Sequence, residues 1–372
     1  GKRVAYAEVD GRGVIYITTP AFFLWALDAK TGRPLEDWGG PVPLEGFSPT
    51  GVVDLIPDFV EDWGPWQDHV AEGGTYDPNY GIPRQLGMVT SSSPPIVVNG
   101  VVVVLVGHQP SYGQSRIENV PGDIMGFDAK TGEFLWKFHV IPRPGEFGHD
   151  TWENDAWQWT GDVSSWAPLA ADMERGIVYI PTNAPTIDYY GGFRPGNNLF
   201  GTSIIALDVE TGNRLWHFQT VHHPIWNYDL PNVPILVDVT VDGEAVPMVI
   251  QTTKQGMTFA FNRVTGEPVW PIVERPVPAS VVPGEQLSAT QPFPTKPPPF
   301  DRQGITIDDL INFTPELRAE AIALADRAQF GPLFSPPVLR GDEKPYIQVP
   351  GAGGGANWQG AAVDPETGWL FV

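Results

Sequence analysis

Lys254 and a short stretch containing His222, His223, Asn227 and Asp229 have side chains suited to moving protons or stabilising charge. Lys254 is expected on an apolar strand, where a buried ammonium group is costly unless it has a ligand. Asp229 and the histidines have basic forms, whereas Asn227 has none at neutral pH. On an extended strand, Asn227 and Asp229 would lie on one side and the two histidines would face opposite ways. At most one histidine then reaches a shared site, and the alternative for both is a structural role.

The elements that must position these side chains are hairpins, because one strand-turn-strand sequence occurs four times. Each copy has a small residue, an apolar residue, Asp or Asn, two variable positions and Thr-Gly. Asp or Asn can bond its own backbone at a turn, and Gly supplies the positive φ that the turn needs. The repeat predicts an all-β fold of multi-stranded blades with loops of different length. The copies are residues 26–32, 126–132 with Trp136, 206–212 with Trp216, and 260–266 with Trp270.

A second kind of strand-turn-strand sequence recurs at residues 9–17, 171–180 and 363–372. Two hairpins make a four-stranded blade, so the chain is expected to hold four to five blades. The tryptophans of the first repeat are expected to dock between neighbouring blades. The first copy lacks its tryptophan at the expected place, and Trp38 follows two residues later.

The composition limits the classes of partner. The chain has 372 residues, a hydrophobic content of 42% and a formal net charge of −22. This charge makes a nucleic acid or an anionic membrane an improbable partner, since both need basic surface. The chain contains no cysteine, so these residues hold no disulfide, zinc thiolate cluster or c-type haem attachment. No apolar run is long enough to span a membrane, and residues 101–106 are expected to be a buried strand.

One stretch departs from the β pattern. Residues 307–330 have Leu, Ile and Ala at helical spacing, with Thr314 and Pro315 placed as N-cap and first helical residue. We expect one inserted helix here, within an inserted loop and helix over residues 296–345. The whole chain, residues 1–372, is expected to form a single domain that is truncated at both ends.

Four motifs in order give the chain a specific resemblance. They are Trp-Ala-Pro at 166–168, Thr-Val-His-His-Pro-Ile-Trp-Asn-Tyr-Asp-Leu-Pro at 220–231, Lys-Gln-Gly at 254–256 and Gly-Gly-Ala-Asn-Trp at 354–358. The chain resembles the quinoprotein dehydrogenases, which depend on pyrroloquinoline quinone (PQQ). Its His-His segment and residues 290–293 are most similar to the membrane glucose dehydrogenase branch. The resemblance implies an eight-bladed β-propeller, of which this chain would cover roughly half.

The resemblance also implies a cofactor site. PQQ is a flat tricarboxylate, so its site needs an aromatic floor, cationic or amide donors and a hard cation. Trp166 matches the floor of the quinone, with a blade-docking role as the alternative. Lys254 matches the basic residue near the quinone oxygens, and Asn357 matches an amide that bonds PQQ. Ser164, two positions before Trp166, and Trp358, directly after Asn357, are included in the cofactor site.

For the metal, the resemblance implies an amide ligand at Asn183, and a carboxylate should join it on calcium. Glu118 is the best candidate carboxylate, although its match to the family pattern is offset by about one residue. An exposed acidic loop residue is the alternative for Glu118.

The catalytic base departs from the family pattern. Members of the family have an aspartate directly after the tryptophan of the His-His segment, where it removes the alcohol proton while hydride passes to PQQ. This chain has Asn227 there, and three interpretations stay open. Asp229 has become the base, Asn227 is a metal ligand, or the enzyme is impaired.

The resemblance therefore implies a periplasmic, PQQ- and Ca²⁺-dependent oxidoreductase acting on an alcohol, polyol or aldose. Its partners would be that small molecule and an electron acceptor, either a quinone or cytochrome c. The alternative is a non-catalytic propeller that serves as an interaction scaffold, because folds of this kind host both functions. Asn227 favours the scaffold, whereas Trp166, Lys254, Asn183 and Asn357 favour the enzyme.

Overall fold

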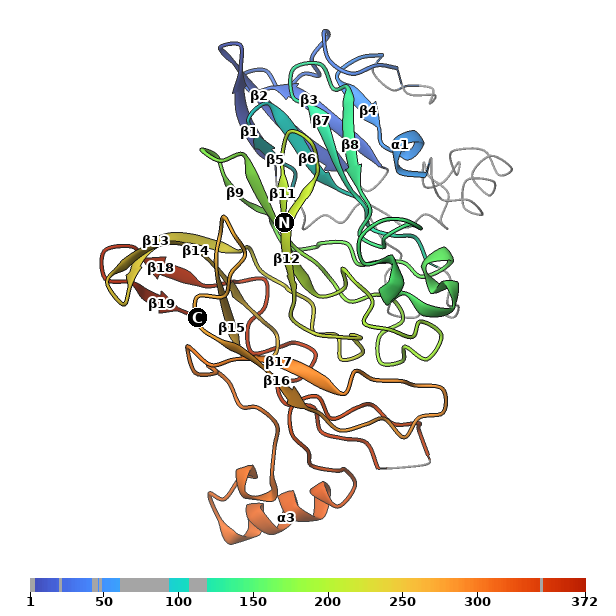
Figure 1. Cartoon of the computed structure of the whole chain (residues 1–372), viewed down its shortest axis with the longest axis vertical. Helices are drawn as coiled ribbons and strands as arrows, with labels where there is room; N and C mark the ends of the chain where they lie inside the picture. The colour runs from blue at the N-terminus through green and yellow to red at the C-terminus, as the bar shows by residue number, and fades with distance from the viewer. Residues whose placement is uncertain are drawn as a thin grey trace.

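The computed structural model describes residues 4–19, 22–41, 46, 49–60, 94–106, 119–341 and 344–372. In this part of the chain, antiparallel β-sheets follow one another in chain order (Figure 1). Three sheets have four strands each, as the paired hairpins predict. They comprise β1 (Ala5–Val9), β2 (Arg12–Thr19), β3 (Phe23–Asp28) and β4 (Val52–Asp54); β5 (Ile96–Val98), β6 (Val101–Leu105), β7 (Ile124–Asp128) and β8 (Phe134–Phe138); and β9 (Ala170–Asp172), β10 (Ile177–Pro181), β11 (Ser203–Asp208) and β12 (Arg214–Gln219).

The remaining described sheets are smaller. They are a three-stranded sheet of β13 (Ile235–Val241), β14 (Glu244–Thr252) and β15 (Thr258–Asn262), and the two-stranded sheets of β16 (Ile272–Pro276) with β17 (Thr290–Pro294) and β18 (Ala362–Asp364) with β19 (Trp369–Phe371). First strands of different sheets make contact, since β1 contacts β5, β9 contacts β13, and β13 contacts β18. The all-β prediction is therefore confirmed, while a closed ring of eight blades stays a prediction.

In the repeated turns, the Asp side chain accepts hydrogen bonds from the turn itself, as the sequence predicts. In the first copy, Asp28 Oδ1 accepts hydrogen bonds from the Thr31 backbone N–H at 2.8 Å and from Thr31 Oγ1 at 2.9 Å. Asp128 and Asp208 repeat both bonds. In the first and fourth copies, prolines reduce the strand after the turn to an isolated bridge, because proline has no N–H for the ladder. These bridges join Leu27 to Pro34 and Phe261 to Pro268.

The tryptophans that accompany the turns dock between sheets, as the sequence predicts. Each indole N–H donates to the carbonyl of the residue that follows Asp or Asn in the next copy. The bonds run from Trp38 to Ala129 at 3.0 Å, from Trp136 to Val209 at 2.8 Å and from Trp216 to Arg263 at 3.0 Å. The glycine of the next turn lies against the indole, since a Cβ on Gly212 would be 2.6 Å from the Trp136 ring.

The hydrophobic core fills the spaces between successive sheets. Val102 and Val104 of β6 pack in the cluster shared with β2 and β3, whereas Val101 and Val103 face the cluster shared with β10 and β11. Alternate residues of a strand point to opposite faces, so a strand buried on both faces must be apolar throughout. The predicted buried strand at residues 101–106 is therefore β6.

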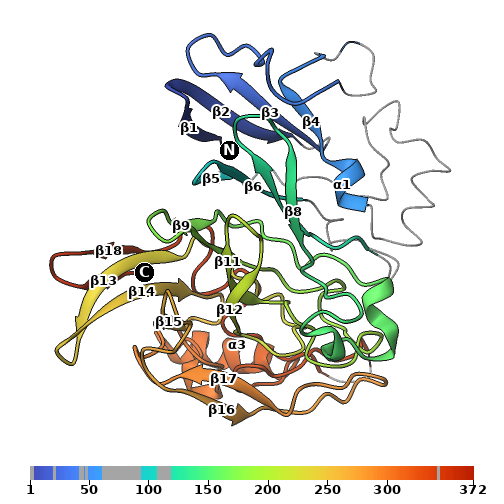
Figure 2. The same ribbon diagram turned by 45° about the horizontal axis from the view of Figure 1, so that its top comes forward.

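The predicted inserted helix is α3 (Pro315–Ala325), and Thr314 caps it by accepting a hydrogen bond from the Leu317 N–H at 3.2 Å. The structure adds the short helix α1 (Ile56–Val60) and the 3-10 turns η2 (His149–Thr151), η3 (Glu153–Gln158) and η4 (Ile307–Asp309). Figure 1 and Figure 2 show α3 in the part of the molecule remote from β1 to β4. No helix in the described ranges is long and apolar enough to cross a membrane.

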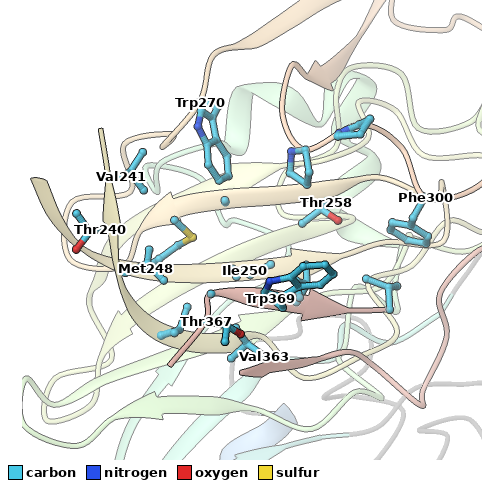
Figure 3. Close-up of a pocket in the computed structure, with 18 of the residues that line it drawn as sticks. Thr240, Val241, Met248, Ile250, Thr258, Trp270, Phe300, Val363, Thr367 and Trp369 are labelled. Carbon is cyan, nitrogen blue, oxygen red and sulfur yellow. The ribbon is translucent and has the colours of Figure 1, made fainter. Parts of the chain in front are cut away.

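A groove of about 710 Å³ lies between the β13–β15 sheet and the β18–β19 hairpin (Figure 3). Its walls are mainly apolar, including Met248, Ile250, Trp270 and Trp369, and they contain no acidic or basic side chain. Trp270 belongs to the fourth turn copy and faces this groove. The groove therefore does not include the charged residues described next.

Candidate active site

Loops from separate parts of the chain bring the candidate residues together. Trp166 precedes β9, Asn227 and Asp229 lie between β12 and β13, and Lys254 follows β14. The expectation that the histidine pair, Asn227 and Asp229 lie on an extended strand is wrong, because these residues form an irregular loop and Asn227 has a φ of 55°. Asparagine tolerates this left-handed conformation better than most residues. Lys254 was also expected on a strand and lies instead in the turn between β14 and β15. Asn227 and Asp229 nevertheless both contact Lys254, through loop geometry instead of strand alternation.

Lys254 is buried and takes the role of a shared donor. Its Nζ donates to the Asn227 backbone oxygen at 2.9 Å, to Asn227 Oδ1 at 2.7 Å and to Asp229 Oδ2 at 3.0 Å. An ammonium group has three protons, so these three acceptors match its full donor capacity. The expected cost of burying Lys254 is thus offset by a carboxylate and two carbonyl oxygens.

Asp229 is held as an ionised carboxylate. Burial by itself would raise its pKa, but the charge of Lys254 and three hydrogen bonds hold the pKa below its ordinary value. The bonds come from the Ala184 N–H to Oδ1 at 2.9 Å, from Lys254 Nζ and from Trp166 Nε1 to Oδ2 at 3.2 Å. Both oxygens of Asp229 are therefore engaged.

Trp166 is partly exposed and borders the same ion pair. Lys254 Nζ lies 5.7 Å from the centroid of the indole ring, within the range of a cation–π contact. An aromatic surface and an ammonium group thus lie next to each other. This is the combination that a flat aromatic ligand with carboxylates requires.

Asn183 and Ser164 form a second polar group with Asp162. Ser164 Oγ donates to Asp162 Oδ1 at 2.8 Å, and Asn183 Nδ2 donates to the same oxygen at 3.2 Å and to Ser164 Oγ at 3.1 Å. Asn183 Oδ1 is buried and has no hydrogen-bond partner in the described part of the structure. Such an oxygen is available to a cation, and the adjacent Ala184 N–H links this group to Asp229.

The predicted metal partner Glu118 lies outside the described residues. Within the described ranges, no group of three or more His, Asp or Glu side chains is placed to hold a metal ion. The described residues thus supply one amide oxygen suited to a cation but not a full ligand set.

Asn357 and Trp358 lie on a glycine-rich loop that packs against Lys254. The Gly355 N–H donates to the Lys254 backbone oxygen at 2.9 Å, and a Cβ on Gly354 would be 2.6 Å from Lys254 Cγ. The Asn357 side chain bonds within its own loop, to the Gly353 oxygen and the Trp358 N–H. Trp358 is 61% exposed. The loop is therefore near the site, but within the described residues the hydrogen bonds of the Asn357 side chain stay in its own loop.

The two histidines have structural partners. His222 contacts Gln219 Oε1 through Nδ1 and Glu274 Oε1 through Nε2. His223 is fully buried between the Gly196 oxygen and Glu285 Oε1, each at 2.7 Å. Burial would raise the pKa of Glu285, but the bond to His223 and its other contacts hold that pKa below its ordinary value. This arrangement matches the structural alternative.

Sequence reasoning missed two carboxylates. Asp162 Oδ1 accepts hydrogen bonds from Ser164 Oγ and Asn183 Nδ2. Asp188 Oδ2 accepts a hydrogen bond from Asn227 Nδ2 at 2.8 Å. Asp188 lies 39 positions before its partner in an irregular loop, so no spacing rule links the two residues. The nearest signal was the position of Asp188 five residues after Asn183.

The comparisons with known proteins agree with the geometry. Residues 2–372 match the family model described as "PQQ: Glucose/ethanol/alcohol dehydrogenase, beta-propeller domain". The chain is 38% identical over 352 residues to the glycerol dehydrogenase large subunit of Gluconobacter oxydans, covering 94% of this chain and 42% of that protein. It is 33% identical over 289 residues to the quinoprotein glucose dehydrogenase of Escherichia coli, covering 75% of this chain and 34% of that protein. The chain therefore spans less than half the length of these relatives.

Among solved structures, a europium-containing methanol dehydrogenase covers 99% of this chain with a TM-score of 0.62 and 20% identity, and the chain covers 51% of it. A quinohemoprotein alcohol dehydrogenase from Pseudomonas putida covers 96% with a TM-score of 0.60 and 23% identity, and the chain covers 42% of it. At these identities the likeness concerns the fold alone. The family match and the relatives together show that the chain belongs to the PQQ-dependent glucose, ethanol and alcohol dehydrogenase family of β-propeller domains.

Proposed function

We propose that this chain carries the active site of a quinoprotein oxidoreductase that oxidises an alcohol, a polyol or an aldose. The single observation that carries the proposal is the buried Lys254, which is paired with Asp229 and bordered by Trp166. A scaffold protein gains little from a desolvated ion pair beside a partly exposed indole, since buried pairs contribute little net stability. A ligand site explains the arrangement better.

The residues fit PQQ. Trp166 would provide the aromatic floor. The positive charge of Lys254, whose three N–H donors already have protein acceptors, would stabilise negative charge that develops on the quinone oxygens. When bound, PQQ supplies the carbon that accepts hydride from the substrate. Ser164, Asn357 and Trp358 are proposed to complete the cofactor site, the last two from the loop that packs on Lys254.

A divalent cation is proposed beside this site, with calcium as the first candidate. Asn183 Oδ1 would be one ligand, because it is a buried amide oxygen that lacks a hydrogen-bond partner in the described structure. Glu118 remains the proposed carboxylate ligand. The cation would act as a Lewis acid that polarises the quinone.

Asp229 and Asn227 both contact Lys254, and their other bonds limit the roles that they can take. Asp229 as the base stays a prediction, and its lowered pKa and fully engaged oxygens support a different role, that of a permanent anion that holds Lys254. Asn227 presents Oδ1 to Lys254 and Nδ2 to Asp188, so both ends of its amide are already used by side chains. A metal-ligand role for Asn227 would require one of these bonds to change.

The substrate, the electron acceptor and the cellular location are proposed from the family. The substrate would be a small alcohol or sugar, and the electrons would pass to a quinone or to cytochrome c. The periplasm is the proposed location. No nucleic-acid partner is proposed, because the net charge of −22 opposes binding to a polyanion.

Reconstitution with PQQ and Ca²⁺ tests the proposal. Quenching of tryptophan fluorescence on titration with PQQ should report saturable binding, which Lys254→Ala should weaken. Lys30→Ala, an exposed lysine in the first hairpin turn, is the matched control and should bind as wild type does. PQQ binding without oxidation of any alcohol or sugar, together with oxidation by Asn227→Asp, would instead identify a degenerate family member.

A further inference from the structure

The hydrogen-bonded network around Lys254 does not end at Asn227. The ammonium group of Lys254 can only donate, so the Asn227 oxygen must face it, and the amide nitrogen must face Asp188. No flipped amide satisfies both neighbours. The Nδ2 of Asn227 therefore donates to Asp188 Oδ2 at 2.8 Å, and the orientation of this bond is determined by Lys254.

This bond places a carboxylate beside the position where the family has its base. An aspartate at position 227 would have a carboxylate oxygen where Asn227 has Nδ2. Asp188 Oδ2 lies one hydrogen-bond length from that point. A general base needs to be within hydrogen-bond reach of the proton that it takes, either directly or through one water. Asp188 meets this distance requirement, and its side chain comes from the loop between β10 and β11.

The two carboxylates near Lys254 differ in their surroundings. Asp229 is buried, paired with Lys254 and bonded at both oxygens, which stabilises its charged form and makes it a weak base. Asp188 is partly exposed to solvent, accepts a hydrogen bond from the neutral amide of Asn227 and interacts electrostatically with the buried guanidinium group of Arg194. A partly exposed carboxylate can also pass a proton on to water. Because Asp188 is partly exposed to solvent, whereas Asp229 is buried and directly paired with Lys254, Asp188 is the better placed of the two to accept a proton and then release it.

We propose that Asp188 is the proton acceptor of the oxidation, with Asn227 holding its carboxylate in place. The proposal rests on the quinoprotein function proposed above. The substrate O–H bond breaks and its proton goes to the Asp188 carboxylate. The carbinol C–H bond breaks with its electron pair, which leaves as hydride for the quinone, so the alcohol is oxidised to a carbonyl and the quinone is reduced. Asp229 keeps its charge and its bond to Lys254 throughout.

The geometry has a consequence that can be measured without cofactor. In Asn227→Asp, two carboxylates would lie one hydrogen bond apart, and like charges at this distance share one proton. Infrared difference spectroscopy at neutral pH should show a protonated carboxyl band in Asn227→Asp. The band should be absent from wild type and from Asn227→Asp/Asp188→Asn. A double variant that retains the band would show that Asp188 is not the partner and would overturn the proposal.

Kinetics of the full-length reconstituted protein test the catalytic role. Asp188→Asn should lower kcat by about 10²-fold or more, the usual loss for a general base, with PQQ affinity and Tm as in wild type. In Asp188→Ala, added formate should restore part of the lost rate, because it replaces the missing carboxylate. Asp242→Asn is the matched control, since Asp242 lies exposed in the β13–β14 turn, remote from the network.

The outcomes separate this proposal from the proposed function. An active wild type with Asp188→Asn turning over within threefold of it would overturn the role of Asp188 and leave the quinoprotein function intact. Loss of PQQ binding in Asp188→Asn, or no rescue by formate, would also overturn the role of Asp188. A wild type that binds no PQQ would contradict the proposed function, while the infrared test of the carboxylate pair would still apply.

Discussion

Replacing Lys254 with methionine should destabilise the protein and reverse the effect of pH on its stability. Methionine keeps much of the apolar volume of the side chain but leaves Asp229 as a buried charge without a cation. Breaking a buried pair by removing one partner costs about 3–5 kcal/mol. At about 2.1 cal/mol/K of unfolding entropy per residue, this corresponds to a fall in Tm of about 4–6 °C for a chain of 372 residues.

The pH dependence follows from the pKa of Asp229. In wild type, this pKa is lower in the folded protein than in the unfolded chain. The ion pair therefore stabilises the fold above the unfolded pKa, and this stability is lost as the pH falls through the folded pKa. Without Lys254, burial dominates and raises the folded pKa above the unfolded value. The stability of Lys254→Met should then increase as the pH falls toward that raised pKa, opposite to wild type.

Denaturant unfolding or calorimetry across a pH series measures both effects. The double variant Lys254→Met/Asp229→Asn removes both charges. Its single amide oxygen can still accept from the Ala184 N–H, but it cannot also replace Oδ2 as the acceptor of Trp166 Nε1, so the variant should recover part of the lost stability. Lys30→Met controls for the loss of a lysine on the surface. The reasoning is refuted if Lys254→Met has the stability and the pH slope of wild type.

Three further predictions concern the cofactor, the metal and the docking of sheets. Trp166→Ala should weaken PQQ binding by about 1–3 kcal/mol, if the contact resembles base-on-aromatic stacking; unchanged affinity with a lower Tm would instead assign Trp166 a purely structural role. Asn183→Ala should lower the Ca²⁺ content after dialysis and remove any rise in Tm on adding Ca²⁺; equal calcium content in variant and wild type would exclude Asn183 as a ligand. Gly212→Ala should be less stable than Gly11→Ala by about 1–3 kcal/mol, because both glycines have positive φ but only the Gly212 Cβ meets an indole, that of Trp136; equal losses in urea unfolding would contradict this.

The local turns could be predicted because their cause is local. In the Asp-x-x-Thr-Gly copies, the Asp side chain accepts a hydrogen bond from the backbone N–H three residues later, as Asp28 does from Thr31. The docking of Trp136 and Trp216 was also predictable, since the indoles repeat with the turns. The helix at Pro315–Ala325 was marked by its cap, Thr314. Each of these features depends on residues within a few positions of one another.

The candidate site was predictable only in part, because loops bring its members together. The contact of Lys254 with Asp229 agrees with the expectation that a buried lysine needs a partner, but the partner's identity depended on the fold. The strand assumed around Asn227 was wrong, since alternation cannot be inferred for a chain with a left-handed residue. Asp188 was missed because its contact with Asn227 depends on loop conformation, which no local pattern encodes.

The most direct test of the central claim is the redox state of quinone bound to the wild-type protein. The full-length protein is reconstituted with PQQ and Ca²⁺, freed of excess cofactor and mixed anaerobically with glycerol, ethanol or glucose while absorbance is recorded. The account predicts that the bound quinone is reduced by at least one of these substrates, with one carbonyl product formed per quinone. A protein that retains no PQQ, or whose bound quinone stays oxidised with alcohols, polyols and aldoses alike, would contradict the account.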